Sequence, residues 1–232
     1  MGSIDLSALM FTIATWAIPV LIAIPLHEAA HGYAAWRLGD PTAKSLGRVT
    51  MNPLVHVSPF GTLILPLLLI VTGAPFLFGW AKPVPVDYRN LRNPKTDMAW
   101  VALAGPGINL FLAFISVVLL RILAFIGEDP TGGFLVEMLQ KSMLLNVILA
   151  VFNMIPVPPL DGGRVLVGVL PMRMAIAVAR FERFGLFALI GILFLAPLLA
   201  SEAGYAFNPF AEFIQPVIIA VMQALFGMVG LL

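Results

Sequence analysis

The chain has 232 residues, of which 60% are hydrophobic and only 11% are charged, and its mean hydropathy is +1.01. Soluble domains are about half apolar and about a quarter charged, so this composition excludes an ordinary soluble domain and predicts an integral protein of the lipid bilayer. A net charge of +1 from scattered basic residues argues against nucleic acid as a partner, and the absence of cysteine leaves histidine and carboxylate as the strong metal ligands.

Five apolar segments are long enough to cross about 30 Å of hydrocarbon as helices. A sixth, residues 59–73, is shorter and contains Pro66, so it is either a thin span or a re-entrant segment. The sequence therefore predicts an all-α polytopic membrane protein with about five or six transmembrane helices. The five longer segments are residues 8–37, 97–126, 134–170, 184–200 and 210–231.

Residues 38–96 differ from the rest of the chain because they are rich in Gly, Pro and Asn. Two β-favouring stretches, residues 47–51 and 81–86, predict short strands there. We therefore expect a short β-containing or re-entrant insertion between the first two long helices.

The basic residues of the connecting segments indicate how the chain is oriented in the membrane. If residues 59–73 re-enter, most of the lysines and arginines gather on one side, and Arg121 and Lys141 lie on the other. By the positive-inside rule, the N-terminus is then outside and the C-terminus inside. The basic residues of the inner side are Arg37, Lys44, Arg48, Lys82, Arg89, Arg92, Lys95, Arg173, Arg180 and Arg183.

The most informative motif is His27-Glu28-Ala29-Ala30-His31 in the first apolar segment. Histidines at i and i+4 lie one turn apart on one helix face, where both can bind one Zn²⁺, and the glutamate between them can face a water on the metal. An ionisable group in the bilayer costs roughly 2.5–3.5 kcal/mol, so a function is the default explanation. With Arg37 near the cytoplasmic surface, helix rise places His31 and His27 about 9 and 15 Å deep.

A catalytic zinc site needs a third protein ligand. The candidates in or near membrane depth are His56 and Asp161. Asp161 is favoured because it follows a proline-rich break in an apolar span, and irregular backbone at that depth is tolerated where it lines a cavity. Asp161 could instead cap a helix after the prolines, and His56 could be either a hydrogen-bonded structural histidine or an auxiliary ligand.

Three motifs follow one another along the chain: His27-Glu28-x-x-His31, Gly105-x-x-x-Asn109, and Asn153 eight residues before Asp161. Together they resemble those of the site-2 protease family of intramembrane zinc metalloproteases. Residues 39–43 and 79–86 look closest to its compact prokaryotic members, which lack PDZ-like and nucleotide-sensing CBS domains. The resemblance covers about residues 8–170.

The resemblance implies that His27, His31 and Asp161 bind one zinc ion and that Glu28 is the general base for hydrolysis of a peptide bond. It also implies that Asn109 and Asn153 are catalytic, holding the substrate backbone or the developing oxyanion. Interhelical hydrogen bonding is the alternative for both asparagines.

Residues 1–232 would then form a single membrane protease domain. Its catalytic core would cover about residues 8–170, and its C-terminal helices, about 184–231, would serve as a substrate gate or a homodimer surface. The expected substrates are transmembrane proteins or signal-peptide remnants in a prokaryotic cell membrane, cut near the cytoplasmic side. Because a helix hides its peptide bonds, cleavage requires unwinding, and the unwound segment could pair with the edge of the strands expected at 47–51 and 81–86.

Two other functions fit parts of the pattern. A membrane metal or ion transporter could use His27, His31 and Asp161 as an ion path. Another class of membrane zincin would take a glutamate from a downstream helix as its third ligand, and no such glutamate lies at a comparable depth. Glu28 favours hydrolysis, because transport needs ligands but no base.

Overall fold

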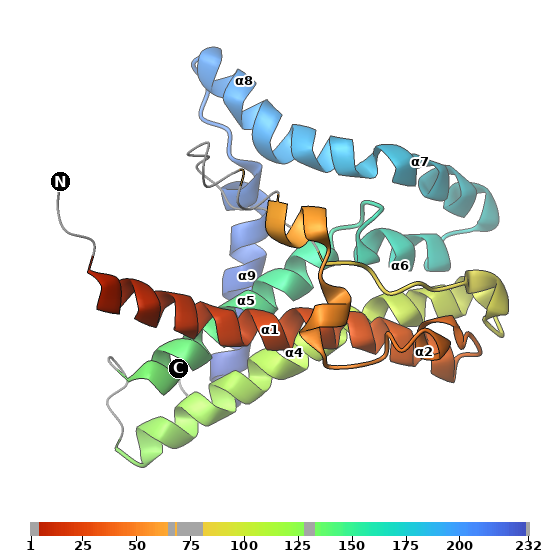
Figure 1. Ribbon diagram of the computed structural model, residues 1–232. Coiled ribbons are helices and arrows are strands. Elements are labelled where there is room, and N and C mark those ends of the chain that lie inside the picture. The colour runs from red at the N-terminus through yellow and green to blue at the C-terminus, as the bar shows by residue number, and fades with distance from the viewer. Residues whose placement is uncertain (1–4, 65–67, 69–80, 128–132, 231–232) are drawn as a thin grey trace.

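A computed structural model describes residues 5–64, 68, 81–127 and 133–230, and these are predominantly helical (Figure 1). Across these ranges no β-strand is present. The predicted all-α class is therefore confirmed, and the predicted β-containing insertion is wrong.

Within the described residues, four helices are long and apolar enough to cross a membrane, and a pair bent by 64° makes a fifth crossing if it is taken as one span. This agrees with the five longer segments of the sequence. Of the expected sixth segment, η2 (Pro59–Ile64) is described, and most of the remainder lies outside the described residues. The four helices are α1 (Leu6–Arg37), α4 (Pro94–Phe125), α5 (Phe134–Asn153) and η5 (Phe210–Ile214) continued by α9 (Gln215–Met228).

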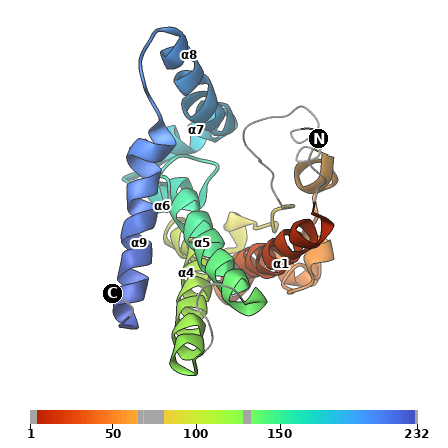
Figure 2. The same cartoon turned by 90° about the vertical axis from the view of Figure 1, so that its left-hand side faces the viewer.

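Helices α1, α4 and α5 pack against one another, and α9 packs on α5 and α4 (Figure 2). Apolar side chains fill the contact between α4, α5 and the helix formed by η5 and α9, where van der Waals packing holds helices together in lipid. Large apolar side chains such as Leu21 and Phe111 are exposed on the outer surface, where a bilayer would cover them. The buried residues of this contact are Ala113, Val117, Met143, Val147, Ile214, Ile218 and Leu225.

Residues 134–170 form two helices rather than one broken span. The chain leaves α5 at Asn153, passes through a proline-rich turn, and begins α6 (Asp161–Val169). With nine residues α6 is too short to cross a bilayer, and it packs against α4 instead. A Cβ on Gly163 would lie 2.6 Å from the carbonyl carbon of Val157, so glycine allows the turn to close over the start of α6.

The expected strands at 47–51 and 81–86 do not form. Residues 81–86 run without regular structure, and Pro83 and Pro85 have no N–H for a ladder. The N–H of Lys82 donates to the carbonyl of His56, and the N–H of Val84 donates to a side chain. Short helical turns occur around this segment: α2 (Thr42–Ser45), η1 (Pro53–His56) and η3 (Tyr88–Asn90).

The predicted span 184–200 lies within a longer helical arm. It starts with α7 (Met172–Ile190) and continues through η4 (Gly191–Leu195) into α8 (Ala196–Glu202), at the top of Figure 1. The helix begins before residue 184 because charged residues such as Arg173 and Arg180 do not stop a helix. They only keep that end of it out of the hydrocarbon.

Candidate metal centre and active site

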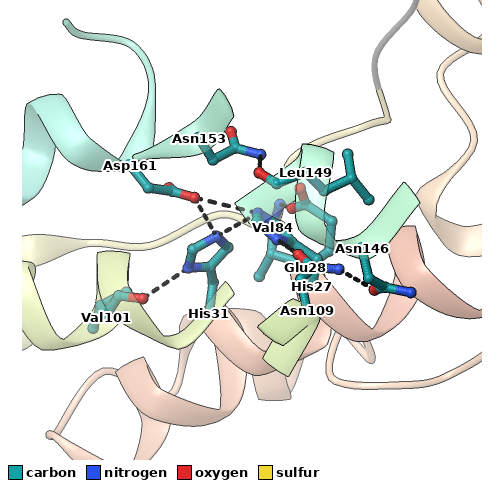
Figure 3. Close-up of polar contacts among 10 residues, drawn as sticks. All are labelled: His27, Glu28, His31, Val84, Val101, Asn109, Asn146, Leu149, Asn153 and Asp161. Carbon is teal, nitrogen blue, oxygen red and sulfur yellow. Dashed lines mark hydrogen bonds and ion pairs between the residues drawn. The ribbon is translucent and has the colours of Figure 1, made fainter. Parts of the chain in front are cut away.

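Three side chains from two helices converge at one point of the bundle (Figure 3). His27 and His31 lie one turn apart on α1, as their spacing predicts, and Asp161 is the first residue of α6. The two Nε2 atoms are 3.0 Å apart, and each lies 3.3 Å from Oδ2 of Asp161. All three side chains are buried. The fold therefore brings together the three residues predicted to bind a metal.

The second ring nitrogen of each histidine faces an oxygen. Nδ1 of His31 lies 2.7 Å from the backbone carbonyl of Val101, and Nδ1 of His27 lies 2.5 Å from Oδ1 of Asn109. Because these oxygens only accept, each Nδ1 carries the proton and donates it. The lone pair of each Nε2 is then left pointing into the cluster.

Three acceptor atoms that face one another favour a cation between them, since a buried polar atom without a partner is costly. Oδ2 of Asp161 is buried and has no hydrogen-bond donor. Zinc bonds of about 2.0–2.1 Å directed to the corners of a tetrahedron place neighbouring ligand atoms about 3.3 Å apart, which matches the separations of 3.0–3.3 Å. The residues therefore fit a zinc ion held by two imidazoles and one carboxylate.

His56, the other candidate ligand, lies outside this cluster. Its Nε2 is 3.1 Å from the carbonyl oxygen of Thr50, and its own carbonyl accepts from Lys82. Among the described residues, His27, His31 and Asp161 are the group whose ligand atoms come close enough to hold a metal. Asp161 is also not the helix cap considered above, because Leu160 takes the cap position.

Gly105 on α4 makes room for both histidines. A Cβ at this position would lie 2.6 Å from Cε1 of each imidazole and would also overlap Nε2 of His31. Gly107 on the same helix has no such neighbour within 4 Å. The glycine of the Gly105-x-x-x-Asn109 motif is thus a steric requirement of the cluster.

Glu28 is held by the extended segment that was expected to be a strand. Its Oε2 accepts a 2.7 Å hydrogen bond from the backbone N–H of Val84. Arg48 in turn fixes that segment, since its Nη2 donates to the carbonyls of Lys82 at 2.9 Å and Pro83 at 3.4 Å. The acid of the motif is therefore anchored by a part of the chain far away in sequence.

Asp40 ties the end of α1 to the continuation of this segment. Its buried carboxylate accepts from the backbone N–H and hydroxyl of Thr42, from Nδ2 of Asn90 and from the N–H of Asp87. Burial alone would raise the pKa of Asp40, but these hydrogen bonds outweigh it and hold the pKa below its usual value. The loop at the helix end thus holds residues 87–90, which directly follow the segment beside Glu28.

The two predicted catalytic asparagines have different surroundings. Asn109 is fully buried: its Oδ1 faces His27, and its Nδ2 donates to Oδ1 of Asn146 at 2.7 Å. Asn153 is the last residue of α5, and its Nδ2 donates to the carbonyl of Leu149 at 2.9 Å (Figure 3). Asn146 was not among the residues predicted from the sequence. The signal for it was a second amide on α5, two turns before Asn153 in an apolar helix.

Several known proteins are similar in sequence to this chain. The model of Peptidase family M50 matches residues 122–196, which include Asp161 but not the histidines of α1. YwhC of Bacillus subtilis, named as a candidate zinc metalloprotease, is 38% identical over 184 residues, covering 78% of this chain and 80% of that protein. Rip2 of Mycolicibacterium smegmatis, named in the same way, is 32% identical over 190 residues, covering 82% and 68%. No solved structure matches the chain.

Proposed function

The chain belongs to peptidase family M50, the site-2 protease family, as a zinc metallopeptidase, and from this premise we propose that it cuts transmembrane segments of other membrane proteins within the bilayer. The observation that carries the proposal is the position of the cluster. His27, Glu28 and His31 lie on α1, which has 32 residues and is apolar enough to cross a membrane. A peptide bond must enter the apolar layer to reach them.

Glu28 acts as the general base in this proposal. It lies between the two histidines in sequence, and the Val84 N–H holds it through one carboxylate oxygen. A bound zinc ion supplies the Lewis acidity that polarises the peptide carbonyl and makes water more acidic. Glu28 takes the proton of the water that attacks the carbonyl carbon, and it delivers that proton to the amine nitrogen as the C–N bond breaks.

The two predicted catalytic asparagines have different roles in this proposal. We assign to Asn153 the contact with the unwound substrate, since it ends α5 just before the turn that leads to Asp161, and a carboxamide can pair with a peptide backbone that has lost its helical hydrogen bonds. Asn109 is engaged on both sides by His27 and Asn146, so it positions a ligand rather than the substrate. Residues 81–86 offer the substrate no strand edge, because no strand forms there.

The membrane arrangement follows from the charges. With the basic connecting segments inside, the N-terminus is outside, the C-terminus is inside, and the cluster is nearer the cytoplasmic surface. Substrates are then transmembrane proteins or signal-peptide remnants that are cut in their cytoplasmic half. The C-terminal helices are the proposed gate or homodimer surface. A role in ion transport has no support from the relatives, whose names are those of proteases.

Glu28→Gln tests the proposal, because glutamine keeps the size of the side chain but cannot act as a base. The purified variant should retain one zinc per chain and should capture substrates in the cell without cutting them. Captured proteins are then incubated in liposomes with the unmodified enzyme and, in parallel, with the variant. Cleavage by the unmodified enzyme alone supports Glu28 as the base, whereas equal cleavage by both would refute that role.

A further inference from the structure

We propose that Asn146 is a positioning residue: acting through Asn109, it sets the tautomer of His27 and so aims the Nε2 lone pair of His27 at the metal. The inference deepens the proposed zinc peptidase function and rests on it. Asn146 lies on α5 and has no direct link to the three predicted ligands in Figure 3; its hydrogen bond to Asn109 on α4 leads to His27.

Hydrogen bonds link the Ser142 carbonyl, Asn146, Asn109 and His27 in a row, and the carbonyl at one end fixes the direction of each. The carbonyl oxygen of Ser142 can only accept, so the atom of Asn146 that lies 2.8 Å from it is the amide nitrogen. The oxygen of Asn146 therefore faces Asn109 and accepts from its amide nitrogen at 2.7 Å. That leaves the oxygen of Asn109 facing His27, where it can only accept a proton from Nδ1.

Burial prevents water from replacing these partners. The exposed fraction is 0% for Asn109 and 1% for Asn146. If Asn146 no longer accepted from it, the amide of Asn109 could turn over and present its N–H₂ to His27. Nδ1 would then have to accept, the imidazole proton would move to Nε2, and Nε2 could no longer bind a metal.

His31 provides an internal comparison. Its Nδ1 donates to the backbone carbonyl of Val101, and this acceptor cannot turn over because it belongs to α4. The tautomer of His31 is therefore independent of any side chain, while that of His27 depends on two amides. The inference predicts an effect of Asn146 on His27 and none on His31.

Two substitutions at Asn146 separate positioning from packing. Asn146→Leu keeps the approximate volume but removes the acceptor that orients Asn109. Asn146→Asp in its protonated form keeps one donor and one acceptor at this position. Its O–H can donate to the Ser142 carbonyl, and its carbonyl oxygen can accept from Asn109. The matched control is Ser116→Ala, which removes a part-buried hydrogen bond of 2.9 Å to the Ser142 hydroxyl between the same two helices. It leaves both partners that orient Asn146, the Ser142 carbonyl and Asn109, in place.

The first measurement is zinc affinity of the full-length protein in detergent, by competition with a chelator. Loss of a partner that orients a metal ligand costs about 10–100-fold in affinity. We expect that loss for Asn146→Leu and an affinity closer to the unmodified protein for Asn146→Asp. For Ser116→Ala we expect a change of less than about twofold, because its hydroxyl bonds to Leu112 and Ser142 and to none of the ligands. Zinc affinity of Asn146→Leu equal to that of the unmodified protein would overturn the inference.

The second measurement reads the tautomers directly. The chain has three histidines, so ¹⁵N-histidine NMR of the metal-free protein at alkaline pH reports each imidazole. In the unmodified protein both His27 and His31 should carry the proton on Nδ1, and in Asn146→Leu only His27 should change. A proton on Nε2 of His27 in the unmodified protein would overturn the inference even if the leucine variant did not fold. Neither measurement uses proteolysis, so failure of the inference is distinct from failure of the proposed function.

Discussion

The backbone N–H of Val84 donates a 2.7 Å hydrogen bond to Oε2 of Glu28 and joins two residues that are 56 positions apart. A hydrogen bond to an ionised group contributes about 1.5–3 kcal/mol, so this contact orients the carboxylate strongly. The segment around Val84 therefore belongs to the proposed catalytic arrangement although it supplies no side chain to the chemistry.

Val84→Pro removes this donor, and Val84→Ala keeps it while shortening the side chain. We expect kcat of the proline variant to fall by about tenfold to a hundredfold, from the strength of a charged hydrogen bond, with unchanged zinc content. Cleavage assays in liposomes with metal analysis of the same samples check this. Equal loss in the alanine and proline variants would mean that packing of the side chain, and not the N–H group, is responsible.

Gly105→Ala places a methyl group against both imidazoles, because the Cβ would lie 2.6 Å from each Cε1 atom. We expect the purified variant to hold well below one zinc per chain and to be inactive. Gly107→Ala on the same helix is the control, since its Cβ meets no atom within 4 Å and alanine favours a helix by up to about 1 kcal/mol. A fully zinc-loaded Gly105→Ala variant would show that the histidines can move without consequence.

Asp40 makes stability depend on pH in the acid range. Its pKa in the folded protein lies below its usual value, which is about 3.9 in an unfolded chain. The stabilisation is therefore complete above about pH 3.9 and is lost as the pH falls through the folded value. The substitution Asp40→Asn isolates this contribution, because the single oxygen of an amide cannot accept from all the donors that surround the carboxylate.

Thermal unfolding of the two proteins from pH 7 to pH 3 measures this contribution. At pH 7 we expect Asp40→Asn to be less stable by about 1–3 kcal/mol, the cost of buried donors left without partners. The difference should shrink as the pH falls towards 3. A difference that stays constant over this range would contradict the assigned role of the carboxylate.

The parts of the site that depend on local spacing could be predicted from the sequence. Two histidines four residues apart on an apolar segment share a helix face whatever the rest of the fold does. Asp161 could also be predicted, because a proline-rich break and a carboxylate in one apolar span both indicate a polar site. The structure places these three residues together.

The parts that depend on partners distant in the chain could not be predicted in the same way. β-favouring residues at 81–86 indicate a strand only if another strand is available to pair with it, and here Val84 pairs with Glu28 instead. Asn146 was missed because its importance comes from Asn109 on another helix. The family resemblance implied a place near the substrate for Asn109, whereas its hydrogen bonds connect it to His27.

The position of the cut in a captured substrate tests the central claim most directly. Mass spectrometry of both fragments, produced by the unmodified enzyme in liposomes with Glu28→Gln as the blank, locates the broken peptide bond. The proposed depth of the His27 and His31 cluster predicts a cut inside the apolar segment, in its cytoplasmic half. A cut confined to a soluble tail of the substrate, outside the apolar segment, would contradict intramembrane proteolysis.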